Sequence, residues 1–156
     1  MKLALAAVVA AAFSTAALAD CAPDRVDIRG DWGKARFTVE VKDSIEERAE
    51  GMMNRPSMAA NFGMIFVYDQ PQRVGFWMRN TLIPLDMIFM SEDGVVRKVH
   101  ENAVPLDETV IMGGDNIQYV LEIKGGMSNL LGIVPGSELR HPSVNQTVAS
   151  WPCNAD

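Results

Sequence analysis

Short apolar stretches separated by turn residues follow one another along this chain, and they restrict its possible folds more than any other feature. Residues 35–43 alternate between apolar and polar side chains, as expected of a strand with one buried face. Only one segment, residues 44–54, has clear helical spacing, and it begins at Ser44, a residue type that favours helix N-termini. Further strands are predicted at 63–70, 75–91, 95–104, 117–126 and 137–142.

This order of elements predicts a mainly β (α+β) fold in a single domain. Strands do not alternate with helices, so a mainly antiparallel sheet, curled as a barrel or sandwich, is expected. The helix at about 44–54 should cover one face or end of that sheet. Residues 20–34 mix charge, proline and glycine, and they predict a loosely held N-terminal segment.

The N-terminus has the features of an export signal. Lys2 precedes a run of apolar residues, which ends at the cleavage-type sequence Ala17-Leu18-Ala19. We therefore expect residues 1–19 to be a cleaved signal peptide and residues 20–156 to form one periplasmic or secreted domain. No later apolar run is long enough to cross a bilayer, so no membrane span is expected after cleavage.

Two cysteines, Cys21 and Cys153, stand near the two ends of the expected mature chain. An even number of cysteines in an oxidising compartment favours a disulfide between them. A redox role would call for closely spaced thiols such as C-x-x-C, and this pair lacks that spacing. Two free thiols remain the alternative.

Charge and motif content exclude several classes of protein. The formal net charge of −6 disfavours binding to nucleic acid, whose backbone attracts cations. Nucleotide-binding glycine motifs and the serine-hydrolase elbow are absent, and neither His100 nor His141 lies in a zinc-ligand spacing. No cofactor and no metal site are therefore predicted. Abundant methionine leaves Cu(I) binding open as an alternative, although the filling of an irregular core is the ordinary explanation.

The stretch FWMRNTLIPLDMIF, residues 76–89, places polar groups inside an apolar run. Pro84 should kink the strand, and Asp86 lies beyond it among apolar neighbours. A buried carboxylate needs partners, so Asp86 could receive hydrogen bonds from Arg79, Asn80 or Thr81 and stiffen the kink. Alternatively, these groups open onto a ligand pocket beside Phe76 and Trp77, or Asp86 is catalytic.

Several segments resemble the family called domain of unknown function 192. The resemblance is carried by GMIFVYD, FWMRNTLIPLDMIF, SEDGVVRKV, YVLEIKGG and LGIVPGSEL, and by the helix EERAEGMMNRP, over about residues 37–140. It implies a small, mostly β domain, often exported, and it implies no activity. Arg48, Gly51, Met53 and Glu122 match outer parts of the family pattern. Gly136-Ser137 departs from it, because the family usually has Gly-Asp there.

The main hypothesis is a non-catalytic binding or accessory module. Its ligand would be a small polar or anionic molecule, or a segment of an envelope protein, held by Trp77, Arg79, Asn80, Thr81, Asp86 and Glu122. One alternative is an envelope hydrolase that uses Asp86 and Glu122, since both carboxyls interrupt apolar strands. The others are Cu(I) binding by methionines and a purely structural or interaction module.

Overall fold

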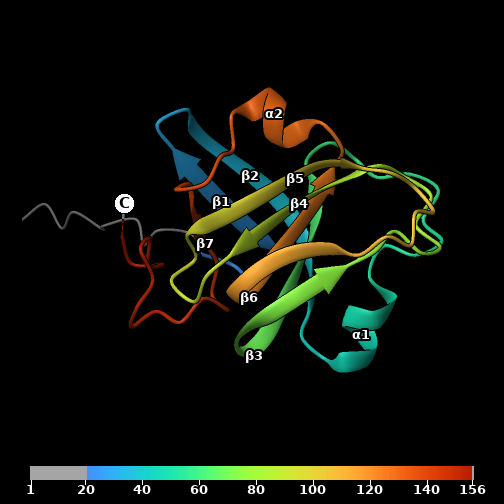
Figure 1. Cartoon of the computed structure of the whole chain (residues 1–156). Coiled ribbons are helices and arrows are strands. Elements are labelled where there is room, and N and C mark those ends of the chain that lie inside the picture. The colour runs from blue at the N-terminus through green and yellow to red at the C-terminus, as the bar shows by residue number, and fades with distance from the viewer. Residues whose placement is uncertain (1–20, 156) are drawn as a thin grey trace, which may run out of the picture.

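The computed structural model describes residues 21–155, so the predicted signal peptide, residues 1–19, lies outside the described residues. This part of the chain forms a mostly β single domain with seven strands and two short helices (Figure 1). In chain order the elements are β1 (Arg25–Gly30), β2 (Gly33–Lys42), α1 (Ile45–Glu50), β3 (Phe62–Phe76), β4 (Leu85–Met90), β5 (Val96–Ala103), β6 (Ile111–Lys124), α2 (Met127–Leu131) and β7 (Glu138–Arg140). The predicted fold class is confirmed.

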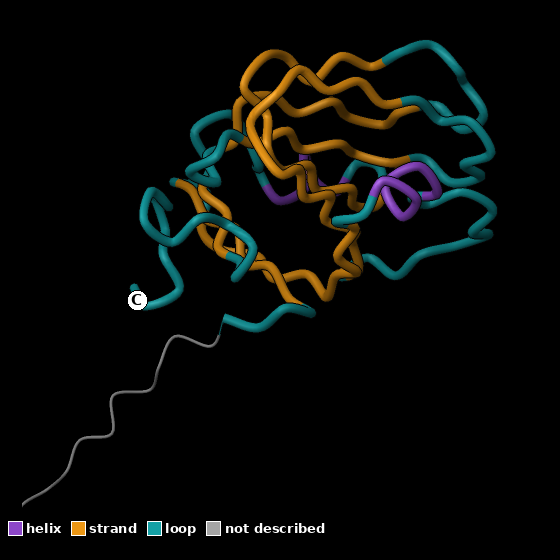
Figure 2. Tube along the Cα trace, turned by 90° about the horizontal axis from the view of Figure 1, so that it is seen from below, coloured by secondary structure: helices purple, strands orange, loops and turns teal. Residues whose placement is uncertain are grey.

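All seven strands belong to one sheet in the order β5-β4-β6-β3-β2-β1-β7. Every pair is antiparallel except β2 and β3, which run parallel. The sheet curls into a half-barrel, and the bridge between Val95 and Glu138 links the β5 side to β7 (Figure 2). The backbone of Val96 adds hydrogen bonds with Ser137 and Gly136 across this seam.

The two faces of the sheet bury two separate apolar clusters. The inner core fills the curl and takes residues from all seven strands, with Ile88, Leu121 and Ile123 fully buried at its centre. The outer core lies on the opposite face of β3, β4 and β6, and it includes Met52 and Met78 from the chain outside the sheet. Because side chains alternate along a strand, neighbouring residues of β4 and β6 contribute to different cores.

The helix α1 is short and depends on its N-terminal cap. The Ser44 hydroxyl accepts a hydrogen bond from the Glu47 backbone, and the Glu47 carboxylate accepts from the Ser44 backbone, which completes a capping box. No residue of α1 is fully buried. A six-residue helix without a buried face has little stability of its own, so this cap matters more than it would in a long helix.

We expect Ser44→Ala to loosen α1 without unfolding the domain. Loss of such a cap typically costs about 1 kcal/mol, which corresponds to roughly fivefold faster opening. Amide hydrogen exchange of Arg48 and Gly51, whose N–H groups bond within this turn, would report it. Ser57→Ala, at an exposed position outside the helix, is the control and should leave those rates unchanged.

The disulfide between Cys21 and Cys153 is present, as predicted. It holds the C-terminal segment against the start of β1. Trp151 is buried in this segment, with the guanidinium groups of Arg29 and Arg140 each 4.3 Å from its ring centroid. The tail is therefore an ordered part of the fold.

The structure differs from the predicted elements at several places. Two strands are longer than predicted, since β3 continues to Phe76 and β6 begins at Ile111. Residues 25–30 form strand β1, whereas a loosely held segment was predicted. The helix ends at Glu50, because Gly51 takes a positive φ of 49°. Residues 77–84 are a loop, whereas a strand was predicted there, and Asn80 has a left-handed φ of 52°.

Candidate ligand-binding site

Asp86 serves the fold and is fully enclosed. Its carboxylate, 0% exposed, lies at the start of β4 and accepts hydrogen bonds from the backbone N–H groups of Asn102, Gly126 and Ser128. The Ser128 hydroxyl donates a fourth bond of 2.6 Å. These contacts join β4 to the end of β5 and to the turn that begins α2. Asp86 is thus a structural residue, and its partners are not the Arg79, Asn80 and Thr81 that the sequence suggested.

Arg79 and Asn80 also lie apart from Asp86. The side chain of Arg79 is 52% exposed, 4.0 Å from Glu108, and its guanidinium is 5.5 Å from the Trp77 ring centroid. The backbone carbonyl of Asn80 accepts a hydrogen bond from Asn54, which ties the loop to the chain after α1. Neither residue lines a pocket near α1, so the predicted group of six site residues does not converge.

Three of the six do meet, in a cavity beneath α1. Trp77 and Thr81 from the 77–84 loop and Glu122 from β6 line a space of about 470 Å³. This volume is within the range of small-ligand pockets. The other lining residues come from α1 and the turn after it, and from β3, namely Ile45, Arg48, Ala49, Glu50, Gly51, Met52, Met53, Phe66, Tyr68, Gly75 and Phe76.

Glu122 is the notable polar group of this cavity. It lies on the outer face of β6, paired with Met64 of β3 on one side and Met87 of β4 on the other. The residue is only 4% exposed, and its Oε2 atom has no hydrogen-bond partner. Burial raises the pKa of Glu122 to about 8, so the carboxyl is mostly protonated at neutral pH.

Aromatic rings form much of the cavity wall. Phe66 and Phe76 meet edge to face with centroids 5.0 Å apart, and Tyr68 follows Phe66 on the same face of β3. Trp77 is 43% exposed and stands at the outer part of the cavity. Burial raises the pKa of Tyr68, so its phenol is neutral and can donate a hydrogen bond.

Arg48 supplies the positive charge on the helix side of the cavity. Its guanidinium donates to the backbone carbonyls of Asp43 and Val67. It also lies 4.8 Å from the centroid of the Tyr68 ring. These contacts fix α1 to β3 and use the Nη1 donors of Arg48.

The predicted pairing of Asp86 with Glu122 in a hydrolase is wrong on geometric grounds. Asp86 alternates with Met87 along β4 and so lies on the inner face, beside Ile88 and Met90, whereas Glu122 lies on the outer face. Two carboxyls on opposite faces of a sheet cannot flank one glycosidic bond.

Methionine fills the core in this fold. Met52, Met64, Met78 and Met87 are buried in the outer core with Phe66, Phe89 and aliphatic side chains. This is the packing role that a flexible thioether serves well. Within residues 21–155, no group of three or more His, Cys, Asp or Glu side chains is placed to hold a metal ion.

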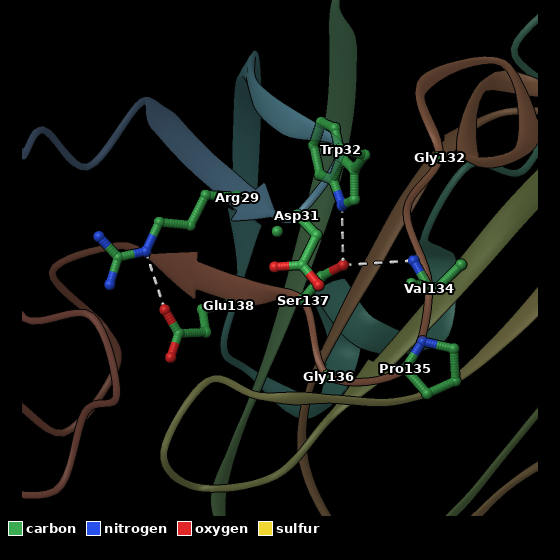
Figure 3. Close-up of a pocket in the computed structure, with 10 residues that line it drawn as sticks. Arg29, Asp31, Trp32, Gly132, Val134, Pro135, Gly136, Ser137 and Glu138 are labelled. Carbon is green, nitrogen blue, oxygen red and sulfur yellow. Dashed lines mark hydrogen bonds and ion pairs between the residues drawn. The ribbon is translucent and has the colours of Figure 1, made fainter.

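A second hollow, of about 570 Å³, lies at the β1–β2 turn beside Ser137 (Figure 3). The polar side chains of Ser137, Trp32, Arg29 and Glu138 in this hollow are paired. The Ser137 hydroxyl accepts from the Trp32 indole at 3.0 Å and from the Val134 backbone, and Arg29 pairs with Glu138 at 2.8 Å. This hollow therefore lacks the unpartnered group that distinguishes the α1 cavity.

The sequence interpretation placed a pocket beside Phe76 and Trp77 but missed Phe66 and Tyr68 as parts of its aromatic wall. A signal was available, because Met64, Phe66 and Tyr68 are each two positions apart and so lie on the same face of one strand. The family pattern also pointed to this cavity. Its outer matches Arg48, Gly51, Met53 and Glu122 all line the cavity together with Trp77 and Thr81.

Neither helix among the described residues is long and apolar enough to span a membrane. The fold and the cavity define a small, mostly β domain with an enclosed acidic group. The chain belongs to the DUF192 family, described as "Uncharacterized ACR", whose pattern matches residues 26–141.

Two crystal structures of similar proteins have the same fold. A protein of unknown function from Novosphingobium aromaticivorans DSM 12444 is 41% identical with a TM-score of 0.72, over 74% of this chain and 82% of that one. A protein from Sinorhizobium meliloti 1021, named a "putative transcription regulator", is 40% identical with a TM-score of 0.72, over 74% of this chain and 90% of that one. No protein with a curated description matches the chain.

Proposed function

We propose that this protein is an exported, non-catalytic binding domain that holds a small ligand in the cavity beneath α1. The observation that carries the proposal is Glu122, a buried carboxyl with an unpartnered oxygen in a cavity lined by aromatic rings. Apolar walls with a few converging polar groups are the usual composition of small-ligand sites.

The contrast with Asp86 supports a ligand over a purely structural role for Glu122. Both are buried carboxyls in central strands, yet Asp86 accepts four hydrogen bonds. An unsatisfied buried polar group costs about 1–3 kcal/mol. A position that only built the fold would be better served by an apolar residue, as at the flanking Met64 and Met87.

Export is part of the same proposal. Residues 1–19 have the composition of a signal peptide. The Cys21–Cys153 disulfide is of a kind that persists in the periplasm or outside the cell and is rare in the cytosol.

The name of the Sinorhizobium relative suggests a role on DNA, and we do not extend it to this chain. A net charge of −6 opposes approach to a phosphate backbone.

The proposal is tested by chemical-shift mapping with a library of small aromatic fragments on isotope-labelled residues 20–156. Fragments that bind should shift the amides of Gly51, Trp77 and Thr81, which border the cavity. Trp77→Ala should weaken those fragments by about tenfold, since a buried aromatic contact is worth roughly 1–2 kcal/mol.

Trp32→Phe, in the second hollow, is the matched control and should leave fragment affinity unchanged. Fragments that shift only the Trp32 side of the molecule would contradict the proposal. So would a library in which no fragment binds at about 5 mM, an affinity near the weak limit of useful recognition.

A further inference from the structure

We propose that the cavity takes a small molecule with a protonated amine on an apolar body, and that the amine lies against Glu122. This inference rests on the ligand-binding function proposed above and specifies the chemistry of the ligand. It departs from the polar or anionic ligand expected from the sequence, because Arg79 does not reach the cavity.

Glu122 lacks a partner inside the protein. Its Oε2 atom is buried without a hydrogen bond, and burial is the sole cause of its shifted pKa. Among residues 21–155, no Lys or Arg side chain forms an ion pair with Glu122, although Arg48 lines the same cavity. An ammonium group from a ligand would supply both the charge and the donors that this oxygen lacks.

The aromatic lining of the cavity also suits a cation. The faces of aromatic rings attract cations, and an aromatic cage with a carboxyl is a common way to recognise an amine. Two rings of the cavity already attract cations of the protein, since Arg48 lies over Tyr68 and Arg79 lies beside Trp77. The inner rings, Phe66 and Phe76, have no such cation among the described residues.

The surroundings of Glu122 predict how binding depends on pH. The titratable groups on the cavity are Arg48 and Glu50 from α1 and Tyr68 from β3, while the strand neighbours Met64 and Met87 are apolar. An ammonium ligand needs the ionised carboxyl, so its binding at neutral pH must release a proton from Glu122. Affinity should then rise about tenfold for each pH unit up to about 8, where Glu122 ionises.

Three probes of similar shape separate the possible ligand chemistries: 2-phenylethylamine, 2-phenylethanol and 3-phenylpropionate. The amine stays protonated below about pH 9.5, as lysine does. At pH 8.5 we expect 2-phenylethylamine to shift the Gly51 and Trp77 amides and to bind at least about tenfold tighter than the alcohol. The propionate should be the weakest, because it places a second carboxylate against Glu122.

Variants at two acidic positions complete the test. Glu122→Gln keeps the side-chain shape and removes the charge, so it should abolish both the preference for the amine and the rise of affinity with pH. Glu46→Gln, exposed on α1 and outside the cavity, changes the net charge equally and should preserve both.

These experiments separate the amine inference from the ligand-binding function proposed above. If the alcohol or the propionate binds in the cavity as tightly as the amine, the amine inference is overturned and the ligand-binding function stands. If none of the three probes binds in the cavity but other aromatic fragments do, the amine inference is likewise overturned and the ligand-binding function stands. If those fragments also fail, both proposals are overturned.

Discussion

Replacing Asp86 by alanine is expected to lower the free energy of unfolding by about 3–5 kcal/mol. The substitution removes the acceptor of four hydrogen bonds, from the N–H groups of Asn102, Gly126 and Ser128 and from the Ser128 hydroxyl, and the two bonds from Ser128 are fully buried. A buried network broken in this way is among the few mechanisms that produce effects of this size. Urea denaturation followed by tryptophan fluorescence would measure it.

Two variants calibrate this experiment. Asp115→Ala removes an exposed carboxylate that pairs with Arg73, and it should cost no more than about 0.5 kcal/mol. Ser128→Ala removes only the hydroxyl donor to Asp86 and should cost about 1 kcal/mol. An Asp86→Ala protein as stable as the Asp115→Ala control would refute the structural role of this carboxylate.

The second large effect is the dependence of stability on pH that Glu122 imposes. The ordinary pKa of this carboxyl is 4.5, and burial raises it to about 8 in the folded protein. Between these values the folded state holds a proton that the unfolded state has lost, so raising the pH favours unfolding. The contribution of Glu122 is fully present below about pH 4.5, and its loss by pH 8 is on the order of 4 kcal/mol.

Comparison of wild type with Glu122→Gln at pH 5 and pH 8 isolates this effect. Glutamine does not titrate, so the difference in unfolding free energy between the two proteins should move in favour of the variant as the pH rises. His141 contributes with the opposite sign, because burial lowers its pKa, but it is present in both proteins and cancels. A difference that stays constant between the two pH values would show that Glu122 is ionised, or solvated, in the folded state.

The strands that could be predicted are those whose pattern is local. Residues 35–43 correspond closely to β2, Gly33–Lys42, because alternation over that stretch is strong. Strand β1 escaped prediction because Val26 and Ile28, though fully buried, are surrounded by charge, proline and glycine.

The 77–84 loop could not be predicted from its apolar composition. Its backbone finds hydrogen bonds in a second loop far along the chain, where Asp107 accepts from Met78 and Leu106 donates to Met78 and Thr81. Such pairing depends on tertiary structure alone.

The surroundings of Glu122 also depend on tertiary structure. The sequence identified this residue as an unusual buried carboxyl but assigned it to the wrong partner. Only the strand register shows which face it occupies.

The position of the disulfide has a practical consequence for how the domain can be attached to other structures. Cys21 and Cys153 bring both ends of the described chain together on one side of the molecule, while α1 lies on the other side (Figure 1). Residues of α1 line the cavity, so the cavity lies away from the two ends. A tag, a fused partner or a surface joined at either terminus would therefore leave the cavity facing outward. The two ends are also close enough for a short linker to join them, so a circularly permuted chain with new ends in an exposed turn should keep the cavity intact.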